Sequence, residues 1–331
     1  MKYYSTSKKF EMNDELKELL LEYRDSRNFD VKKYLDSKME VFNSYIERFN
    51  IDSCVVALSG GIDSTVVYAM LQYFKANTEN SNLKNIYGIC LPAKDLKTGV
   101  TNQDSLTKKV EKLLEKYGQP YRELNVTPLI DSLNTEMAKT DFWVSDDWAK
   151  GQSVSYLRTP MYYYVTSLLT ARGEKSIVVG TTNKDEGAYL GYFGKASDGM
   201  VDIQLVSDIH KREVYEIAKY LTLPKEIIEA VPTGDMYDNR SDEEVFGTSY
   251  DFVELYLWYL ESIKNSMNRD ITQYITTEET LELFNKFAQN LEDLHEYNSH
   301  KYLGHSPAVH MDILKGTEKI KNGWRYFNYE K

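Results

Sequence analysis

The sequence contains little cysteine, and it has no long apolar run. Cys54 and Cys90 are the only cysteines among 331 residues, and each lies in an apolar, strand-like segment. Two such cysteines do not indicate a disulfide framework; they indicate small buried side chains in a reducing compartment. No apolar stretch is long enough to cross a bilayer, and the chain does not open with a secretory signal pattern. We therefore expect a cytoplasmic protein with no membrane partner.

Positive charge is also scarce relative to negative charge. The chain has 40 Lys and Arg residues against 51 Asp and Glu residues, which gives a formal net charge of −11. Surfaces that bind nucleic acids concentrate Lys and Arg against the phosphate backbone. This charge balance argues against nucleic acid as a main partner. The hydrophobic content of 42% is enough for a large buried core.

Strand-like runs alternate with helical patterns through the first two thirds of the chain. We predict strands over Ser53–Leu58, Asn85–Leu91, Tyr121–Val126, Ser176–Gly180 and Val201–Val206. We predict helices between them over Ile62–Ala76, Thr101–Tyr117, Pro128–Lys139 and Val154–Arg172. This alternation predicts an α/β fold with a doubly wound, mainly parallel sheet and helices on both faces.

Helical patterns flank the predicted sheet on both sides. We expect a helical extension over residues 1–50, a domain that holds the sheet over 51–298, and a tail without clear periodicity over 299–331. After the last strand we predict helices over Lys211–Leu221, Lys225–Val231, Glu243–Ile263 and Thr277–Tyr297. The polar segments Lys94–Asn102 and Asp141–Gln152 predict loops. No flexible linker divides the chain, so we expect one domain with helical extensions.

The segment Ser59-Gly60-Gly61-Ile62-Asp63-Ser64-Thr65 is the most informative motif. It lies between a predicted strand and a predicted helix, where backbone N–H groups and the helix dipole favour a bound anion. Adjacent glycines let a phosphate approach the backbone closely, and the Asp63 carboxylate could hold Mg²⁺ beside it. The alternative is an ordinary glycine turn with a capping serine. The matched positions in this setting favour nucleotide binding.

The motif differs from the common nucleotide-binding loops. No Gly-Lys-Ser/Thr follows at the spacing of a Walker loop, and the Gly-x-Gly-x-x-Gly pattern is absent. Ser-Gly-Gly-x-Asp-Ser resembles the PP-loop of ATP pyrophosphatases. These enzymes split ATP into AMP and pyrophosphate while they adenylate a substrate.

Four further polar segments follow the predicted strands and helices. They are Gly180–Glu186, Gly191–Asp202, His210–Arg212 and Pro232–Asp235. The first offers hydroxyl groups and the carboxylate of Glu186, and the second is rich in glycine, as loops are. The third begins a helix with positive charge, which the helix dipole disfavours unless an anion lies nearby.

In this order and spacing, the five segments resemble ammonia-dependent NAD synthetases. The resemblance extends from about Asp52 to Tyr259, with a weaker match at His300-Lys301. It implies ATP as co-substrate, Mg²⁺ as cofactor, deamido-NAD and ammonia as small-molecule substrates, and a homodimer. It also implies that the tail from residue 299 closes the substrate site.

The resemblance assigns roles to individual positions. ATP contacts are implied for Ala57, Leu58, Ser59, Gly60, Gly61, Ile62, Asp63, Ser64, Leu91, Thr181, Lys211 and Thr233. Dinucleotide contacts are implied for Arg158, Lys195, Asp198, Asp202, His300 and Lys301. Asp63 and Glu186 are the implied Mg²⁺ ligands, and the implied catalytic residues are Asp63, Lys211 and Thr233.

Three positions depart from the family pattern. Pro160 stands where the family has a second arginine after Arg158, His210 stands where threonine is common, and Tyr302 stands where the family has arginine. The first and third departures remove positive charge from the substrate side. A ligase that adenylates another carboxylate, or a catalytically silent nucleotide-binding homologue, therefore remains an alternative.

The implied reaction needs positioned charges more than a protein nucleophile. The sequence offers Lys211, backbone N–H groups and carboxylates, and we choose Lys211 to stabilise the developing charge on the α-phosphate. Glutamine use would require a domain with a nucleophilic cysteine. Because Cys54 and Cys90 are predicted to be buried, we expect ammonia as the nitrogen source, and a separate glutaminase partner remains open.

Overall fold

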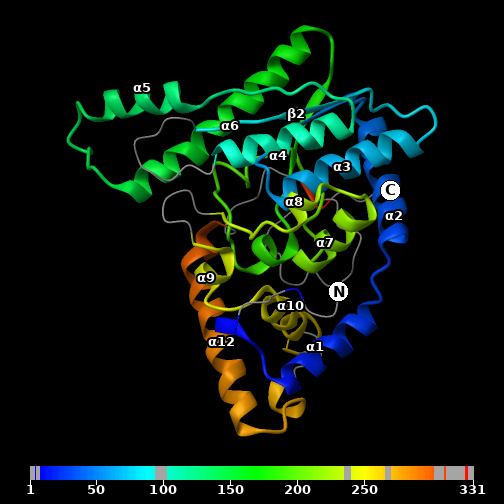
Figure 1. Cartoon of the computed structure of the whole chain (residues 1–331), viewed down its shortest axis with the longest axis vertical. Helices are drawn as coiled ribbons and strands as arrows, with labels where there is room; N and C mark the ends of the chain where they lie inside the picture. Colours follow the sequence, from blue (N-terminus) through cyan, green and yellow to red (C-terminus); the bar gives the residue numbers. More distant parts are fainter. Residues whose placement is uncertain are drawn as a thin grey trace.

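The structure is a computed structural model, shown in Figure 1. It describes residue 4 and residues 8–93, 103–234, 240–264, 270–301, 309–310 and 325–326. The predicted loop Lys94–Asn102 and the start of the helix predicted from Thr101 lie outside the described residues. So does Asp235. No helix in the described ranges has the length and apolar character that crossing a membrane requires.

The centre of the molecule is a parallel sheet. Its strands are β1 (Ser53–Ala57), β2 (Asn85–Ile89), β3 (Ser176–Gly180), β4 (Ile203–Gln204), β5 (Val309–His310) and β6 (Arg325–Tyr326), in the order β2-β1-β3-β4-β5-β6. Every neighbouring pair is parallel. The predicted α/β fold with a parallel sheet is therefore confirmed. The tail, in which the sequence shows no periodicity, contributes the last two short strands.

Helices cover both faces of this sheet. On one face lie α2 (Val31–Arg48), α3 (Ile62–Asn77), α4 (Gln103–Lys116), α7 (Lys211–Tyr220) and α8 (Lys225–Ile228). On the other lie α5 (Thr127–Met137) and α6 (Asp147–Ala171). Cys54 and Val56 face the first layer, while Val55 between them faces the second. This alternation is the two-residue period of a strand buried on both sides.

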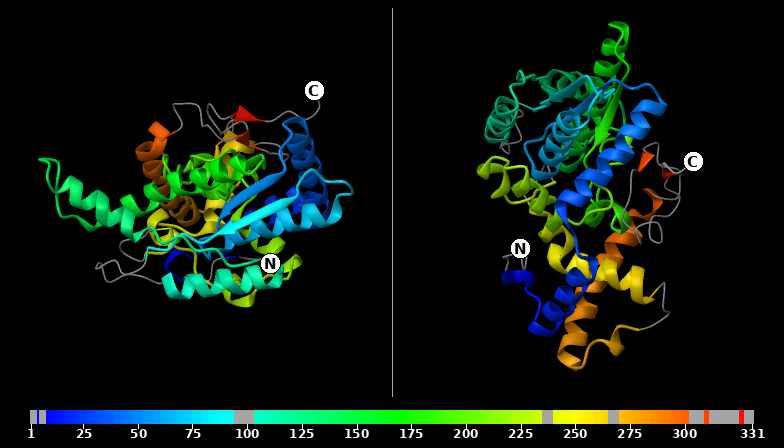
Figure 2. Two further views of the ribbon diagram at one scale, coloured as in Figure 1. Left: turned by 90° about the horizontal axis from the view of Figure 1, so that it is seen from above. Right: turned by 90° about the vertical axis from the view of Figure 1, so that its right-hand side faces the viewer.

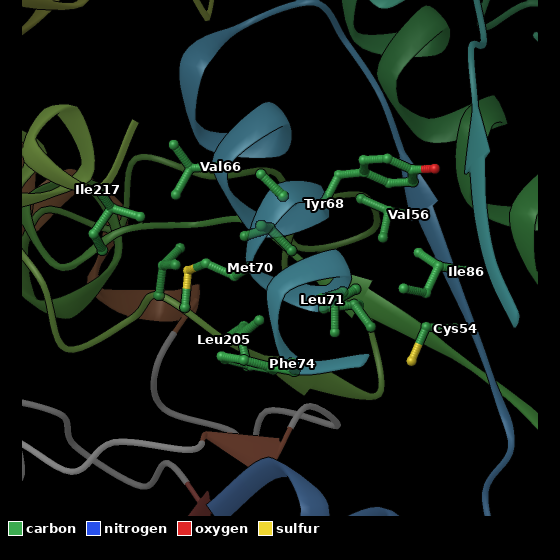
Figure 3. Packing of buried hydrophobic residues seen from close by; sticks show 14 of the residues in the cluster. Cys54, Val56, Val66, Tyr68, Met70, Leu71, Phe74, Ile86, Leu205 and Ile217 are labelled. Atoms are coloured by element: carbon green, nitrogen blue, oxygen red, sulfur yellow. The ribbon is translucent and has the colours of Figure 1, made fainter. Parts of the chain in front are cut away.

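Helix α3 fills the centre of the first layer. Its buried side chains include Met70, Leu71 and Phe74, which pack near Cys54 of β1 and Leu205 beyond β4 (Figure 3). Cys54 and Cys90 are both buried and free of disulfides, as predicted.

A second group of helices extends from the sheet, at the bottom of Figure 1 and of the right-hand view in Figure 2. It contains α1 (Asp14–Arg27), α9 (Asp242–Phe246), α10 (Tyr250–Trp258) and α12 (Glu278–Asn298), and a π-helical segment, Tyr259–Lys264, continues α10. Short 3₁₀ helices lie at Lys8–Phe10, Ile271–Gln273 and Ser299–Lys301, and a second π-helical segment lies at Asp185–Tyr189. These helices share an apolar core of their own. The first and last parts of the chain therefore pack together.

The strand predicted over Tyr121–Val126 is wrong. This segment forms one isolated bridge, between Cys90 and Glu123, at the end of β2. Leu124 N–H donates to the Cys90 carbonyl oxygen at 2.9 Å, and α5 begins at Thr127. The chain turns into a helix before a longer ladder can form.

Two predicted boundaries are also wrong. The loop predicted over Asp141–Gln152 ends early, because the Asp146 side chain accepts the Ala149 N–H at 2.8 Å and starts α6 at Asp147. The single helix predicted over Glu243–Ile263 is divided at Gly247, whose φ of +66° ends α9. A left-handed glycine commonly terminates a helix in this way.

Candidate active site

Three parallel strands end side by side at one edge of the sheet. Ala57, the last residue of β1, pairs with Ile89 in β2, and Val55 pairs with Val178 in β3. The segments that follow these strands leave the same edge, where ligands bind in open α/β sheets. The loop 59–65 follows β1, and the turn 180–186 follows β3.

Hydroxyl groups close the loop after β1. Ser59 Oγ lies 3.2 Å from Ser64 Oγ and accepts the Gly61 N–H at 3.2 Å. Gly60 has a φ of +81°, and a Cβ at this position would lie 2.8 Å from the Leu106 carbonyl oxygen. Only glycine suits this left-handed and crowded position.

Helix α3 begins without a side-chain cap. Its N-cap residue is Gly61, which has no side chain to accept a hydrogen bond from the first turn. The first N–H groups of a helix have no intrahelical partner, and they carry the positive end of the dipole. Ser59 is exposed and Gly61 is half-buried, so the loop is open to a ligand. The arrangement suits an anion such as phosphate.

Asn183 connects the loop after β1 to the turn after β3. Its Nδ2 donates to Asp63 Oδ1 at 2.9 Å, and its Oδ1 accepts the Glu186 N–H at 3.1 Å. Asn183 is fully buried. One amide side chain therefore fixes the spacing between the segments that carry the Asp63 and Glu186 carboxylates.

Lys211 supplies the charge between those carboxylates. Its Nζ lies 2.6 Å from Asp63 Oδ2 and 2.9 Å from Glu186 Oε1. Its side chain is only 1% exposed, whereas that of Asp63 is 19% exposed and that of Glu186 14%. Burial lowers the pKa of Lys211, but the two carboxylates raise it more, and the pKa stands well above its ordinary value. The ammonium group stays charged because its partners replace the lost water.

Tyr250 and Asp242 lie behind Glu186. The Tyr250 hydroxyl is 2.8 Å from Glu186 Oε1 and 2.7 Å from Asp242 Oδ2. A hydroxyl group has one proton to donate, so it satisfies one carboxylate at a time. Burial raises the pKa of Glu186 to about 7; Lys211 opposes this rise, and the Asp63 and Asp242 charges add to it. The Glu186 carboxyl group therefore binds a proton more readily than an exposed glutamic acid does.

The carboxylates of Asp63 and Glu186 could ligate a divalent cation. Both lie within hydrogen-bond distance of Lys211 Nζ, which places the two carboxylates next to each other. Among the described residues, no group of three or more His, Cys, Asp or Glu side chains could hold a metal ion alone. Mg²⁺ suits a pair of carboxylates of this kind, because it is usually bound by one or two carboxylates together with substrate phosphates.

The other residues predicted to contact ATP lie at the strand ends and on the segment around Thr233. Leu58 and Leu91 are buried at the ends of β1 and β2, and Thr181 is half-buried directly after β3. Thr233 is exposed, on the segment where the Pro232 carbonyl oxygen accepts the Asp242 N–H at 3.2 Å.

Arg158 extends from α6 to the end of β2. Its Nε–H donates to the Leu91 carbonyl oxygen at 2.9 Å. Within the described residues, its terminal amino groups have no hydrogen-bond partner. Burial lowers the pKa of Arg158. The guanidinium group is therefore anchored at one nitrogen while its outer donors remain available.

The remaining predicted dinucleotide contacts do not converge. Lys195 and Asp198 are exposed on the loop after Gly194. Asp202 Oδ2 instead accepts the Val178 N–H of β3 at 2.6 Å, and burial raises its pKa. This geometry gives Asp202 a partner within the sheet.

The end of α12 holds the glycine-rich loop by its carbonyl groups. His295 Nδ1 lies 2.6 Å from the Tyr189 carbonyl oxygen, and Asn298 Nδ2 donates to that of Leu190 at 2.8 Å. Lys301 Nζ donates to the carbonyl oxygens of Gly191 and Phe193, at 2.9 and 2.8 Å. His300 is exposed. We call His295, Asn298 and Lys301 the α12 clamp.

Sequence reasoning missed Asn183, Tyr250, Asp242 and two members of the α12 clamp, His295 and Asn298; Lys301 was predicted, but as a dinucleotide contact. Asn183 lies inside the 180–186 motif, which was already part of the predicted site, so its amide side chain could have been selected as a candidate site residue. Tyr250 lies in an apolar helix among 27 tyrosines, so its sequence context gives no hint of its role.

Comparisons with known proteins identify the family of this chain. The family model described as NAD synthase matches residues 34–303. The NH₃-dependent NAD⁺ synthetase of Thermoplasma acidophilum is 35% identical over 198 residues, which cover 60% of this chain and 73% of that protein.

Solved structures support the fold. An NMN synthetase from Francisella tularensis superposes with a TM-score of 0.62 at 22% identity, and an NH₃-dependent NAD synthetase from Campylobacter jejuni with 0.58 at 19%. Each alignment covers 82% of this chain and 96% of the other. Given the extent of the family match, the chain belongs to the NAD synthase family.

Proposed function

We propose that this protein is an ATP-dependent ligase that amidates deamido-NAD with ammonia to form NAD. The observation that carries the proposal is the convergence of Asp63, Glu186 and Lys211 beside the uncapped start of α3. This is a site for a nucleotide phosphate and its counter-charges. The identity of the reaction is inferred from membership in the NAD synthase family.

The chemistry takes place in two balanced steps. An oxygen of the nicotinate carboxylate attacks the α-phosphorus of ATP; a P–O bond forms, and the bond to pyrophosphate breaks. Ammonia then attacks the acyl carbon, the C–O bond to AMP breaks, and one proton leaves the nitrogen. Adenylation is required because a free carboxylate has no adequate leaving group.

The site residues act by position and charge. The N–H groups at the start of α3 bind phosphate, and Lys211 Nζ stabilises the negative charge that grows on the α-phosphate. Asp63 and Glu186 would hold Mg²⁺, which supplies further charge neutralisation at the phosphates. Because Lys211 pairs with both carboxylates, it is held at this point before ATP binds, which reduces the entropic cost of alignment.

Arg158 is the proposed anchor for the dinucleotide substrate. Its free outer donors suit a carboxylate or a pyrophosphate, which Arg binds in a bidentate manner. Lys195, Asp198 and His300 are exposed and able to join it, and Lys301 would act by holding the loop that carries Lys195.

A homodimer is the proposed assembly. Leu129 and Leu133 on α5, the segment Phe142–Val144, and Trp148, Tyr156, Tyr164 and Leu168 on α6 are exposed apolar side chains. We call this group the α5–α6 apolar surface. Phe142 is 77% exposed and Tyr164 65%. An exposed apolar group of this extent is typical of a protein interface, and α5 and α6 form the outer layer at the top of Figure 1.

Pro160 lies on the same surface. Tyr156, Pro160, Tyr164 and Leu168 follow one another at four-residue intervals along α6, and all four are exposed. Residues spaced in this way share a helix face. The replacement of the family's second arginine by proline therefore supports a more apolar contact between protomers.

Ammonia is the proposed nitrogen donor, and the cytoplasm the proposed location. Cys54 and Cys90 are buried within the sheet, and burial raises the pKa of the Cys54 thiol. Neither suits a glutaminase nucleophile, which must be an accessible thiolate.

Pyrophosphate exchange tests the adenylation step without ammonia. Protein incubated with ATP, Mg²⁺ and labelled pyrophosphate should form labelled ATP only when deamido-NAD is added. Pyrophosphate exchange that does not require deamido-NAD but requires another carboxylic acid would contradict this proposal. Such a result would favour the alternative, a ligase that adenylates another carboxylate.

A further inference from the structure

A buried chain of side chains leads from the N-terminal helix to Lys211. The Tyr23 hydroxyl lies 2.9 Å from His210 Nε2, and His210 Nδ1 lies 2.6 Å from Asp185 Oδ1. Asp185 Oδ2 accepts the Lys211 backbone N–H at 2.7 Å. His210, Asp185 and Lys211 are at most 1% exposed, and Tyr23 is 6% exposed.

Asp185 explains how Lys211 can begin a helix. Lys211 is the first residue of α7, where positive charge opposes the helix dipole. The Asp185 carboxylate places negative charge at this end and satisfies the Lys211 N–H. Asp185 directly precedes Glu186, so one short segment holds both the backbone and the side chain of Lys211.

His210 connects Asp185 to Tyr23 of helix α1. Burial, together with the positive charges of Lys184, Arg27, Arg212 and Arg24, lowers the pKa of His210 well below its ordinary value. A neutral imidazole can donate from Nδ1 to Asp185 while Nε2 accepts the Tyr23 hydroxyl proton. Burial raises the pKa of Asp185, and the Lys211 N–H opposes that rise.

Two arginines of α1, Arg24 and Arg27, form ion pairs near the start of α7. Arg27 Nε lies 2.6 Å from Glu213 Oε1, and Glu213 Oε2 accepts the His210 N–H at 3.0 Å. Arg24 pairs with Glu254, which also pairs with Arg212 at 3.3 Å. The last two turns of α1 therefore contact His210 and Glu213 directly and Arg212 through the Glu254 carboxylate.

Helix α1 lies outside the part of the chain that the family model matches. The match begins at residue 34, whereas Tyr23, Arg24 and Arg27 precede it. His210 is itself a departure from the threonine that is common in the family. Tyr23, Arg24 and Arg27 therefore support the start of α7 from outside the segment that the family model matches.

We propose that Tyr23, His210 and Asp185 are positioning residues that hold Lys211 for phosphoryl transfer. The inference rests on the proposed function, because it assumes that Lys211 stabilises the α-phosphate. Loss of the Tyr23 hydroxyl should loosen the start of α7 and lower the turnover number, with little change in substrate binding.

The test compares two tyrosine variants of the full-length protein. Tyr23→Phe removes the hydroxyl bonded to His210, and Tyr34→Phe removes the α2 hydroxyl that donates to Asp208 Oδ1 at 2.8 Å. Each removes a buried hydrogen bond, and Tyr34→Phe should lose at least as much stability in urea as Tyr23→Phe, because Asp208 is paired with Lys38. We expect kcat to fall on the order of tenfold for Tyr23→Phe. The KM values for ATP and deamido-NAD should stay within about twofold, and kcat of Tyr34→Phe should stay near wild type.

The remaining outcomes separate this inference from the proposed function. If Tyr23→Phe keeps wild-type kcat while Lys211→Met is inactive, the positioning role is wrong and the function stands. If Lys211→Met keeps wild-type kcat, the proposed role of Lys211 fails first. Equal losses of kcat in Tyr23→Phe and Tyr34→Phe would show a general effect on stability and overturn the inference.

Discussion

Lys211 and Asp63 form an ion pair of 2.6 Å although 148 positions separate them in sequence. The pair joins the first helix after β1 to the helix after β4, and Glu186 from the turn after β3 completes it. Three segments of the sheet edge thus meet at one buried ammonium group. Charge placed in this way before substrate binds is the main means by which such sites stabilise a transition state.

The first prediction concerns the two carboxylates. Asp63→Asn and Glu186→Gln should each lower kcat at least about 100-fold, because each removes a charge at the phosphates without changing side-chain shape. Far-UV circular dichroism should show that both variants remain folded. Asp36→Asn, which alters an exposed pair with Lys32, is the matched control and should keep full activity. Normal turnover in either site variant at ordinary Mg²⁺ would remove that residue from the site.

The second prediction separates the dinucleotide from ATP. Arg158→Ala should raise the KM for deamido-NAD by the equivalent of about 1.5–3 kcal/mol, the cost of one charged hydrogen bond. The KM for ATP should change far less. Arg172→Ala, at the exposed end of the same helix, serves as the control. Because Arg158 also holds the Leu91 carbonyl oxygen, an equal loss for ATP would assign it to the nucleotide side instead.

The third prediction concerns nitrogen donors. A protein in which Cys54 is alanine and Cys90 is serine should still make NAD from ammonium, because neither thiol lies at the site. Some stability should be lost, since both side chains are buried. If pure wild-type protein used glutamine as well as ammonium, the proposed nitrogen source would be wrong.

The fourth prediction addresses the α5–α6 apolar surface. Trp148→Glu and Tyr164→Glu should each convert the dimer to monomer in light scattering at micromolar concentration, because a buried unpaired charge is costly. Tyr220→Glu changes an exposed aromatic residue on α7, away from this surface, and should leave the dimer intact. A wild-type monomer would contradict the proposed assembly.

The fifth prediction follows from Lys301 in the α12 clamp. Burial lowers the pKa of Lys301 to about 8, and Asp198 opposes this shift. The folded protein therefore binds this proton less tightly than the unfolded chain does. The native state then gains stability relative to the unfolded state as pH rises from about 8 toward the ordinary lysine value. The free energy of unfolding of wild type minus that of Lys301→Met should increase across this range. A constant difference would show that Lys301 is not buried as described.

The sequence predicted the sheet and most of the sheet-edge segments, because both depend on local patterns. The apolar run before Ser59 and the glycine pair after it specify a strand, a turn and a helix start. The run at Tyr121–Val126 also predicts a strand, but it contains Arg122, Glu123 and Asn125, and it forms only a single bridge at the end of β2. Whether a segment pairs with another strand depends on contacts between distant parts of the chain, and a local sequence pattern does not contain them.

The supports of the site could not be predicted in the same way. The positive start of α7 was recognised as unfavourable, and its compensation comes from Asp185, 26 positions earlier. Tyr23 lies 187 positions from His210 and Tyr250 lies 64 from Glu186, so these pairs exist only in the folded chain. The same holds for the α12 clamp, whose polar side chains at three-residue spacing resemble an ordinary solvated helix face.

The most direct test of the proposed reaction is product analysis with purified protein, ATP, Mg²⁺ and ammonium chloride. Deamido-NAD and nicotinic acid mononucleotide, which carries the same nicotinate carboxylate, would be supplied in parallel. We predict that deamido-NAD gives NAD, AMP and pyrophosphate in equal amounts, with a higher kcat/KM than the mononucleotide. Formation of NMN in preference to NAD, or no consumption of deamido-NAD at all, would contradict the proposed function.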